Sequence, residues 1–552
     1  MGFLLNTVNQ NGFNLILFLT TLMDGYDEFL KKKVEESSLV DIASKYDKYA
    51  ILNYARLSNF DASDIELLYV ISNYLDWGNS TDLKWPDLKE MFSEVTRIKN
   101  ELTPYNDIFM VNANLRNIRA IRPFWLTIPI YKEILLPLDD QVKINTGFSA
   151  KEIFDSIFDV LLYLDSIQNG DRQPHLDLIN NDQEPEPLKM LWKKYSANLS
   201  ELRSFGDIWD KSLITGDGNF RVALSYKLPE TIYRSLCREL SDTYRKFGDK
   251  KGRALENVIS NEFESFFKSY HLKKRIRLRE DSSRELDLAV EGNDFALLVE
   301  SKSASFRNKS SDNSVLNAIS DLSPLVKGIS QLLPFFKAFR SGNKEVQLSN
   351  GDIEALNSHQ LVLGAVITDD IYTTIALDSV YKSYSAKDKT DETLQNYPIW
   401  IGSIFDLKFL LQVSQTPSVL FHYIAHFRSQ TNSHLMEEAD SWQLYARLTE
   451  DSAGIMAIGN QVLPSDLLWG YEMWNLLKKG KNHYVAPTWL KDSLNELKSL
   501  DKEGRILESM KIIDKEWRMA VREFYLRYEI VPIIENTKSP RYTIKIIKYR
   551  DY

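Results

Sequence analysis

The chain has a single cysteine, Cys237, among its 552 residues, so no disulfide bond can form within it. This lack excludes the small disulfide-stapled secreted scaffolds and gives no sign of an oxidising compartment. The sequence also lacks the run of about 18 apolar residues that a membrane-spanning helix needs. Its best candidate, Phe13–Met23, is short and contains Asn and Thr. We therefore expect a cytoplasmic protein with no membrane partner, in which this segment is a buried helix or strand.

Several functional motifs are absent as well. The sequence contains no P-loop, no G-x-G-x-x-G, no G-x-S-x-G and no Cys/His zinc cluster, so no ATP-driven motor is visible. Hydrophobic residues make up 43% and charged residues 26%, which is the range of ordinary globular proteins and excludes a disordered or collagen-like chain. At about 150 residues per domain, the length predicts three or four domains.

The hydrophobic patterning predicts three regions. Residues 1–227 read as a mainly helical N-terminal region, with a 3.6-residue apolar period over Glu152–Gln168 and a polar, Pro-containing loop or boundary over Asn169–Leu188. Residues 426–552 read as a helical, Trp-rich C-terminal region that ends in a hairpin, Glu529–Ile534 and Arg541–Tyr549.

The middle region, residues 228–425, has an α/β pattern. Two helices are expected at Pro229–Phe247 and Gly252–Tyr270, and a long one at Val315–Arg340. Short β-type runs occupy Lys273–Arg279, Glu285–Val290, Phe295–Lys302, Leu361–Thr368 and Ile399–Ser403, and the last of these leads into a helix at Phe405–Val413.

The most informative segment is Arg284–Lys302, RELDLAVEGNDFALLVESK. Gly292-Asn293 is typical of a tight turn between two strands. With these two as the central turn residues, Asp287 faces Leu298, and Glu285 faces Glu300. Because side chains alternate along a strand, Asp287, Glu300 and Lys302 share one face, with the two acids as diagonal neighbours roughly 7–8 Å apart at the backbone.

Two carboxylates so placed can share a divalent metal ion. The opposite face carries the residues expected to form the core, Leu286, Leu288, Val290, Leu297 and Val299. An alternative reading stays open from spacing alone: the charged residues line a solvated face, and Lys302 pairs with a carboxylate. Exposed pairs of this kind contribute only about 0–1 kcal/mol.

This pattern resembles the PD-(D/E)XK nuclease superfamily, which has the restriction-endonuclease-like fold. The resemblance covers roughly residues 228–425 and rests on Asp287, on Glu300-Ser301-Lys302, on the helix that follows, and on Glu256 in the preceding helix. Leu286 stands in place of the name-giving proline, and Phe335 stands where one branch of the superfamily has tyrosine.

The resemblance implies a mixed sheet flanked by helices and an Mg²⁺- or Mn²⁺-dependent nuclease. Asp287, Glu300 and Glu256 would be the metal ligands, and Lys302 would position the attacking water or stabilise the charged transition state. Large nucleases of this type often act in bacterial defence against phage, which is an analogy only. A second copy of the chain or a partner protein that gates activity is left open.

Charge supports a nucleic-acid substrate, with DNA favoured over RNA. Residues 231–350 carry 21 Lys and Arg against 16 Asp and Glu, a net charge of +5 in a chain whose total is −9. The expected phosphate contacts are Arg275, Arg277, Arg279, Arg307, Lys309, Lys327 and Gln331. The three arginines at 275–279 fit equally well an edge strand whose charged side chains prevent aggregation. Gln331 fits equally well an exposed helix face that contacts only solvent.

One further pair attracts notice. His422 and His426 are spaced i, i+4, but no third ligand stands nearby in a metalloprotease pattern, and the neighbouring aromatic residues favour packing. Two other functions remain open for the whole chain: a catalytically inactive nucleic-acid-binding or interaction protein on the same fold, and a helical scaffold whose acidic hairpin is only surface.

Overall fold

The computed structural model of the protein describes residues 122–167, 186–198, 213–216, 219–222, 228–303, 315–370, 397–428, 438–449, 477–480 and 486–527. The chain divides into two compact units, Met1–Val258 with Ser303–Asp321, and Ile259–Lys302 with Leu322–Tyr552. Helices α15 (Phe247–Phe266) and α16 (Val315–Ser341) run through this division. The predicted boundaries after residues 227 and 425 stay a prediction, and both Phe13–Met23 and the terminal hairpin lie outside the described residues.

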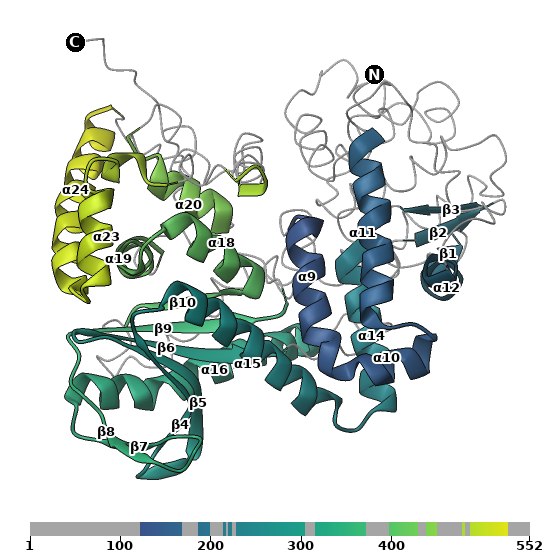
Figure 1. The fold of residues 1–552 in the computed structure, drawn as a ribbon, viewed down its shortest axis with the longest axis horizontal. Coiled ribbons are helices and arrows are strands. Elements are labelled where there is room, and N and C mark those ends of the chain that lie inside the picture. Colours follow the sequence, from purple (N-terminus) through teal and green to yellow (C-terminus); the bar gives the residue numbers. More distant parts are fainter. Residues whose placement is uncertain are drawn as a thin grey trace, which may run out of the picture. The chain divides into compact units, whose positions relative to one another are not determined.

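The described part of the first unit is mainly helical (Figure 1). The amphipathic helix predicted at Glu152–Gln168 is confirmed as α11 (Ala150–Ile167), which buries Ile153, Phe154, Ile157 and Leu161 and leaves Leu162 exposed. A small sheet escaped the sequence prediction: β1 pairs parallel with β2, and β2 pairs antiparallel with β3. The other elements are α9 (Phe124–Leu135), η2 (Leu136–Leu138), α10 (Asp139–Thr146), α12 (Glu186–Tyr195), β1 (Ser196–Asn198), β2 (Leu213–Gly216), β3 (Asn219–Val222) and α14 (Leu228–Thr243).

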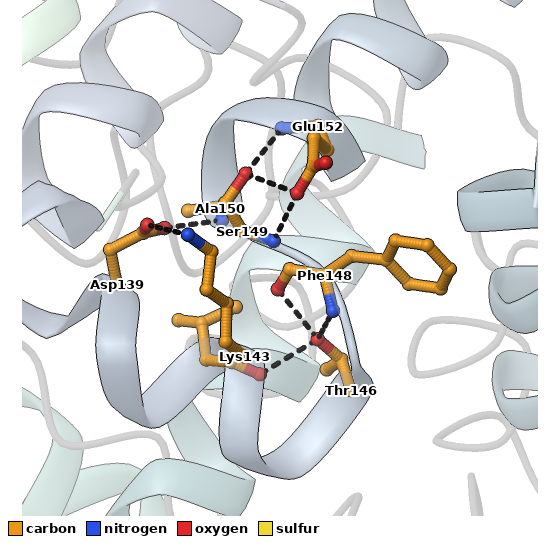
Figure 2. Close-up of polar contacts among 8 residues, drawn as sticks. Asp139, Lys143, Thr146, Phe148, Ser149, Ala150 and Glu152 are labelled. Atoms are coloured by element: carbon orange, nitrogen blue, oxygen red, sulfur yellow. Dashed lines mark hydrogen bonds and ion pairs between the residues drawn. The ribbon is translucent and has the colours of Figure 1, made fainter.

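The corner between α10 and α11 is fixed by local capping (Figure 2). Gly147 ends α10 at φ +84°, a left-handed conformation that glycine adopts without strain. At the start of α11, the Ser149 backbone N–H donates to Glu152 Oε2 (2.7 Å), and the Glu152 N–H donates back to Ser149 Oγ (3.1 Å). This reciprocal pair satisfies backbone donors that the first helical turn would otherwise leave open.

The second unit is built on a seven-stranded mixed sheet in the order β10-β9-β6-β5-β4-β7-β8 (Figure 1). The pairs β10–β9 and β9–β6 are parallel, and the remaining neighbours are antiparallel. The strands are β4 (His271–Leu278), β5 (Asp281–Glu291), β6 (Phe295–Lys302), β7 (Glu345–Gln347), β8 (Ile353–Ala355), β9 (Leu361–Thr368) and β10 (Ile399–Ser403). The predicted α/β class and five of these strands are therefore confirmed.

Both faces of the sheet are covered, which corrects the expected division into one core face and one polar face. On one face, Leu298 of β6 packs with Val366 of β9 and with Ile329 and Leu332 of α16. On the other face, the rings of Phe295 and Phe421 pack together with their centroids 4.8 Å apart. A sheet enclosed on both faces explains why β6, β9 and β10 are almost continuously apolar.

The register of the central hairpin differs by two residues from the expected one. Leu288 pairs with Val299, Glu291 pairs with Ala296, and the Gly292 backbone N–H donates to the Phe295 carbonyl (3.0 Å). The central turn residues are therefore Asn293 and Asp294 instead of Gly292 and Asn293. From this turn, Asp294 Oδ2 accepts the backbone N–H of Leu507 (2.9 Å) at the start of α24. A shift of two residues keeps the paired side chains on their expected faces, and the regular pairing ends at Leu288 and Val299, one residue short of Asp287 and Glu300.

The alternation along β5 also changes. Leu286 packs in the same cluster as Ala289 and Leu298, although alternation would put Leu286 on the face of Leu288. The change lies beside Arg275 of β4, a non-glycine residue at φ +50°.

The C-terminal helices belong to the same unit as the sheet. They are α18 (Ile404–Ser414), α19 (Pro417–His422), a π-helical turn η6 (Tyr423–Arg428), α20 (Glu438–Ala446), η9 (Thr488–Leu490), α23 (Leu494–Lys502) and α24 (Ile506–Arg527). Asp501 joins two of them, since its Oδ2 accepts the Ser418 backbone N–H (2.8 Å). Among the described helices, none has the length and apolar character to cross a membrane.

Candidate active site in the central hairpin

Asp287 lies on β5, one residue beyond Leu288, which forms the last regular pair with β6. Its Oδ2 accepts both the backbone N–H and the hydroxyl of Ser301, each at 2.7 Å. The carboxylate thereby satisfies a backbone donor of β6 and is held beside the Glu300-Ser301-Lys302 segment. Ser301 is a positioning residue that the sequence analysis did not single out, although it stands between the two predicted site residues.

Glu300 is the most deeply buried of the predicted site residues, with a side chain only 1% exposed. Its Oε1 accepts a hydrogen bond from Lys302 Nζ. Its other oxygen, Oε2, is buried and has no hydrogen-bond partner among the described residues. The alternative of a solvated acidic face is therefore wrong for Glu300, although Lys302 does pair with it.

Burial and like charge act together on these acids. Burial first, and the neighbouring charge of Asp287 second, raise the pKa of Glu300 to about 8, against the opposing effect of Lys302. Burial also raises the pKa of Asp287, while the two bonds from Ser301 act in the opposite direction. The charge of Asp287 therefore opposes ionisation of Glu300, and Lys302 does not fully offset it.

Helix α16 lies directly over this end of β6 because of Gly328. A Cβ atom at Gly328 would stand 2.7 Å from Val366 Cγ1 and 3.4 Å from Lys302 Cγ, so only a glycine allows the approach. Lys327 is exposed, and Gln331, one turn further, is half-buried with an Oε1 that has no partner among the described residues. An isolated glycine inside a helical pattern was the available signal for this contact.

Glu256 is a half-buried residue of α15 in the stretch that belongs to the first unit. Its role as a third acid stays a prediction. Arg307 and Lys309 lie outside the described residues.

The basic strand β4 is not an edge strand, because it lies between β5 and β7. Arg277 is paired with Glu285 at 2.6 Å, and Arg279 is paired with Glu345. These pairs are about half exposed, so each is worth little and can be exchanged for a phosphate at small cost. Arg275 adopts the positive φ noted above. The three arginines remain predicted phosphate contacts.

The donor set fits a hard divalent cation. Carboxylate oxygens are the ligands that Mg²⁺ prefers, and Glu300 Oε2 is a buried oxygen without a partner in the described structure. A bound cation would also neutralise the repulsion that raises the pKa of Glu300.

Comparison of the chain with protein-family models, with curated proteins and with solved structures finds no match.

Proposed function

We propose that the protein is a metal-dependent nuclease that hydrolyses phosphodiester bonds, with DNA as its substrate before RNA. The observation that carries the proposal is the buried pair of Asp287 and Glu300, set on adjacent central strands with Lys302 bonded to Glu300. A restriction-endonuclease-like fold is part of the proposal, since a mixed sheet with central acidic strands and helices on both faces is compatible with it. A role in bacterial defence against phage is proposed from the sequence resemblance alone.

In this mechanism, Asp287 and Glu300 would hold one or two Mg²⁺ ions. The ion would lower the pKa of a bound water molecule and stabilise the charge that develops on the phosphate. Ser301 fixes the orientation of the Asp287 carboxylate through two hydrogen bonds. Lys302, with a side chain only 15% exposed, is the cation beside these acids and would orient water or stabilise the pentacovalent phosphate once Glu300 turns to its ligand role.

The test is a cleavage assay with supercoiled plasmid, linear duplex DNA, single-stranded DNA and RNA, each with Mg²⁺, Mn²⁺ or EDTA. Lys302→Ala and Asp287→Asn should lower the rate by roughly 10²–10³-fold, the effect of losing one electrostatic group. Lys274→Ala is the matched control, since Lys274 is on the neighbouring strand and pairs with Glu264 at the surface (2.6 Å).

Wild type that cuts none of the four substrates with either metal would contradict the proposal. If wild type still binds double-stranded or single-stranded DNA in a binding assay, the alternative of an inactive nucleic-acid-binding protein is favoured. Cleavage by Asp287→Asn at the full rate would show that the hairpin acids are structural.

A further inference from the structure

A second cluster of metal-type ligands lies among the C-terminal helices, apart from the hairpin. His422 ends α19, His426 lies in the π-helical turn that follows, and Asp514 lies on α24, which packs against α19 (Figure 1). One ligand atom from each residue lies within 4.8 Å of the other two. The sequence offered only the histidine pair, and the fold supplies the third group.

The two nitrogens of His422 are in different situations. Nδ1 lies 3.0 Å from the Tyr445 hydroxyl, while Nε2 is buried and has no hydrogen-bond partner among the described residues. Nε2 lies 3.9 Å from Asp514 Oδ1, which is too long for a hydrogen bond. With Nδ1–H donating to Tyr445, Nε2 carries a free lone pair that points toward the acid. Metal-bound histidines typically have one ring nitrogen on the metal and the other N–H donated to a fixed acceptor.

The other two groups leave room for an ion. The rings of His422 and His426 are 4.8 Å apart between centroids, and His426 is half-buried. Arg518 donates to Asp514 Oδ2 at 2.8 Å, so Oδ1 remains on the histidine side. A tetrahedral zinc ion with bonds of about 2.0–2.1 Å needs ligand atoms about 3.3 Å apart. The spread of up to 4.8 Å is wider than that separation, so zinc binding would require rotation of the partly exposed His426 and Asp514 side chains.

We propose that His422, His426 and Asp514 bind one Zn²⁺ ion, with the fourth position open to water. Three protein ligands with an open position are the pattern of reactive zinc sites, whereas structural sites are closed by four protein ligands. The site is independent of the hairpin acids and of the proposed nuclease function.

The competing explanation is that His422 is one more ring in an aromatic cluster. The rings of Tyr445, Trp489 and Trp517 do surround it, with centroids 5.8 to 6.2 Å away. Packing alone, however, leaves Nε2 buried without a partner, and buried polar atoms are nearly always satisfied. A cation at the cluster satisfies Nε2 and the Asp514 carboxylate together.

The test uses the full chain without an affinity tag, stripped with EDTA and freed of chelator, and titrated with ZnCl₂ by calorimetry. With excess Mg²⁺ present to occupy the hairpin acids, wild type should bind one equivalent. His426→Ala and the isosteric Asp514→Asn should weaken binding by about 100-fold or more, and Tyr445→Phe by about 10- to 100-fold through loss of the orienting hydroxyl. The matched control is His271→Ala, because His271 is an exposed histidine on β4. Its affinity should stay within about twofold of wild type.

Two further measurements make the result decisive. The double variant Asp287→Asn/Glu300→Gln should keep the zinc affinity, which separates this site from the hairpin. Co²⁺ in place of Zn²⁺ should give intense visible absorption from tetrahedral coordination in wild type and not in Asp514→Asn. Far-ultraviolet circular dichroism confirms that each variant is folded. Absence of Zn²⁺ binding by wild type, or equal binding by Asp514→Asn and wild type, would overturn the proposal.

Discussion

Replacing Glu300 by glutamine tests whether ionisation of the buried hairpin acid is unfavourable. The folded-state pKa of Glu300 is about 8, against an ordinary value of 4.5. Between these values the folded protein binds a proton that the unfolded chain has released, so stability falls as pH rises from about 4.5 to 8. At about 1.36 kcal/mol for each pKa unit, the full loss is of the order of 5 kcal/mol. The amide of the Glu300→Gln variant would imitate the protonated acid, so this variant would not lose stability in the same window.

The assay is urea unfolding of the full chain, monitored by tryptophan fluorescence at pH 5 to 9. It is run once in EDTA and once in excess Mg²⁺. Wild type should lose stability toward pH 8 relative to Glu300→Gln, and Mg²⁺ should restore wild type but not the variant. Glu264→Gln is the control, since Glu264 is an exposed carboxylate paired with Lys274. A difference between wild type and Glu300→Gln that does not change from pH 5 to 8 would refute the reasoning.

Two other substitutions probe the surroundings. Gly328→Ala should destabilise the protein by about 1–3 kcal/mol in urea unfolding, because its Cβ would stand 2.7 Å from Val366 Cγ1 and overpack the contact between α16 and β9. Gly351→Ala is not a suitable control because of its positive φ, whereas Gly252→Ala, with no atom near its Cβ, should be neutral or stabilising. Glu438→Ala should cost about 3–5 kcal/mol in the same assay, since it removes a carboxylate 3.2 Å from the buried Arg428 guanidinium.

The sequence was most informative where a strand or helix is defined by its own side chains. The bounds of β6, β9 and β10 match the predicted runs, because parallel strands buried on both faces are written as continuous apolar segments. Helix α16 was likewise visible over nearly its whole length. The short strands β7 and β8 were missed, since three residues such as Glu345–Gln347 carry no period.

Features that depend on contacts between distant residues could not be predicted from the sequence. The hairpin turns at Asn293-Asp294, and Asp294 is bonded to Leu507, which lies far along the chain. The change of face along β5 accompanies a positive φ at Arg275, which a β-type run of basic residues does not announce. The histidine cluster gains Asp514 only when α24 packs on α19. Short-range pattern therefore located the candidate residues, while long-range packing decided how they meet.

The depth of Glu300 changes how the hairpin must be interpreted. Had the acids lined a solvated face, their repulsion would be screened and the pair with Lys302 would account for them at almost no cost. With Glu300 1% exposed, ionisation in the absence of a cation is opposed both by burial and by Asp287, and a single lysine does not offset these effects, as the raised pKa shows. Glutamine or leucine at this position would fold with less penalty. Two acids at this position carry a cost in stability that a bound cation would remove, which is the physical basis for proposing a functional site here.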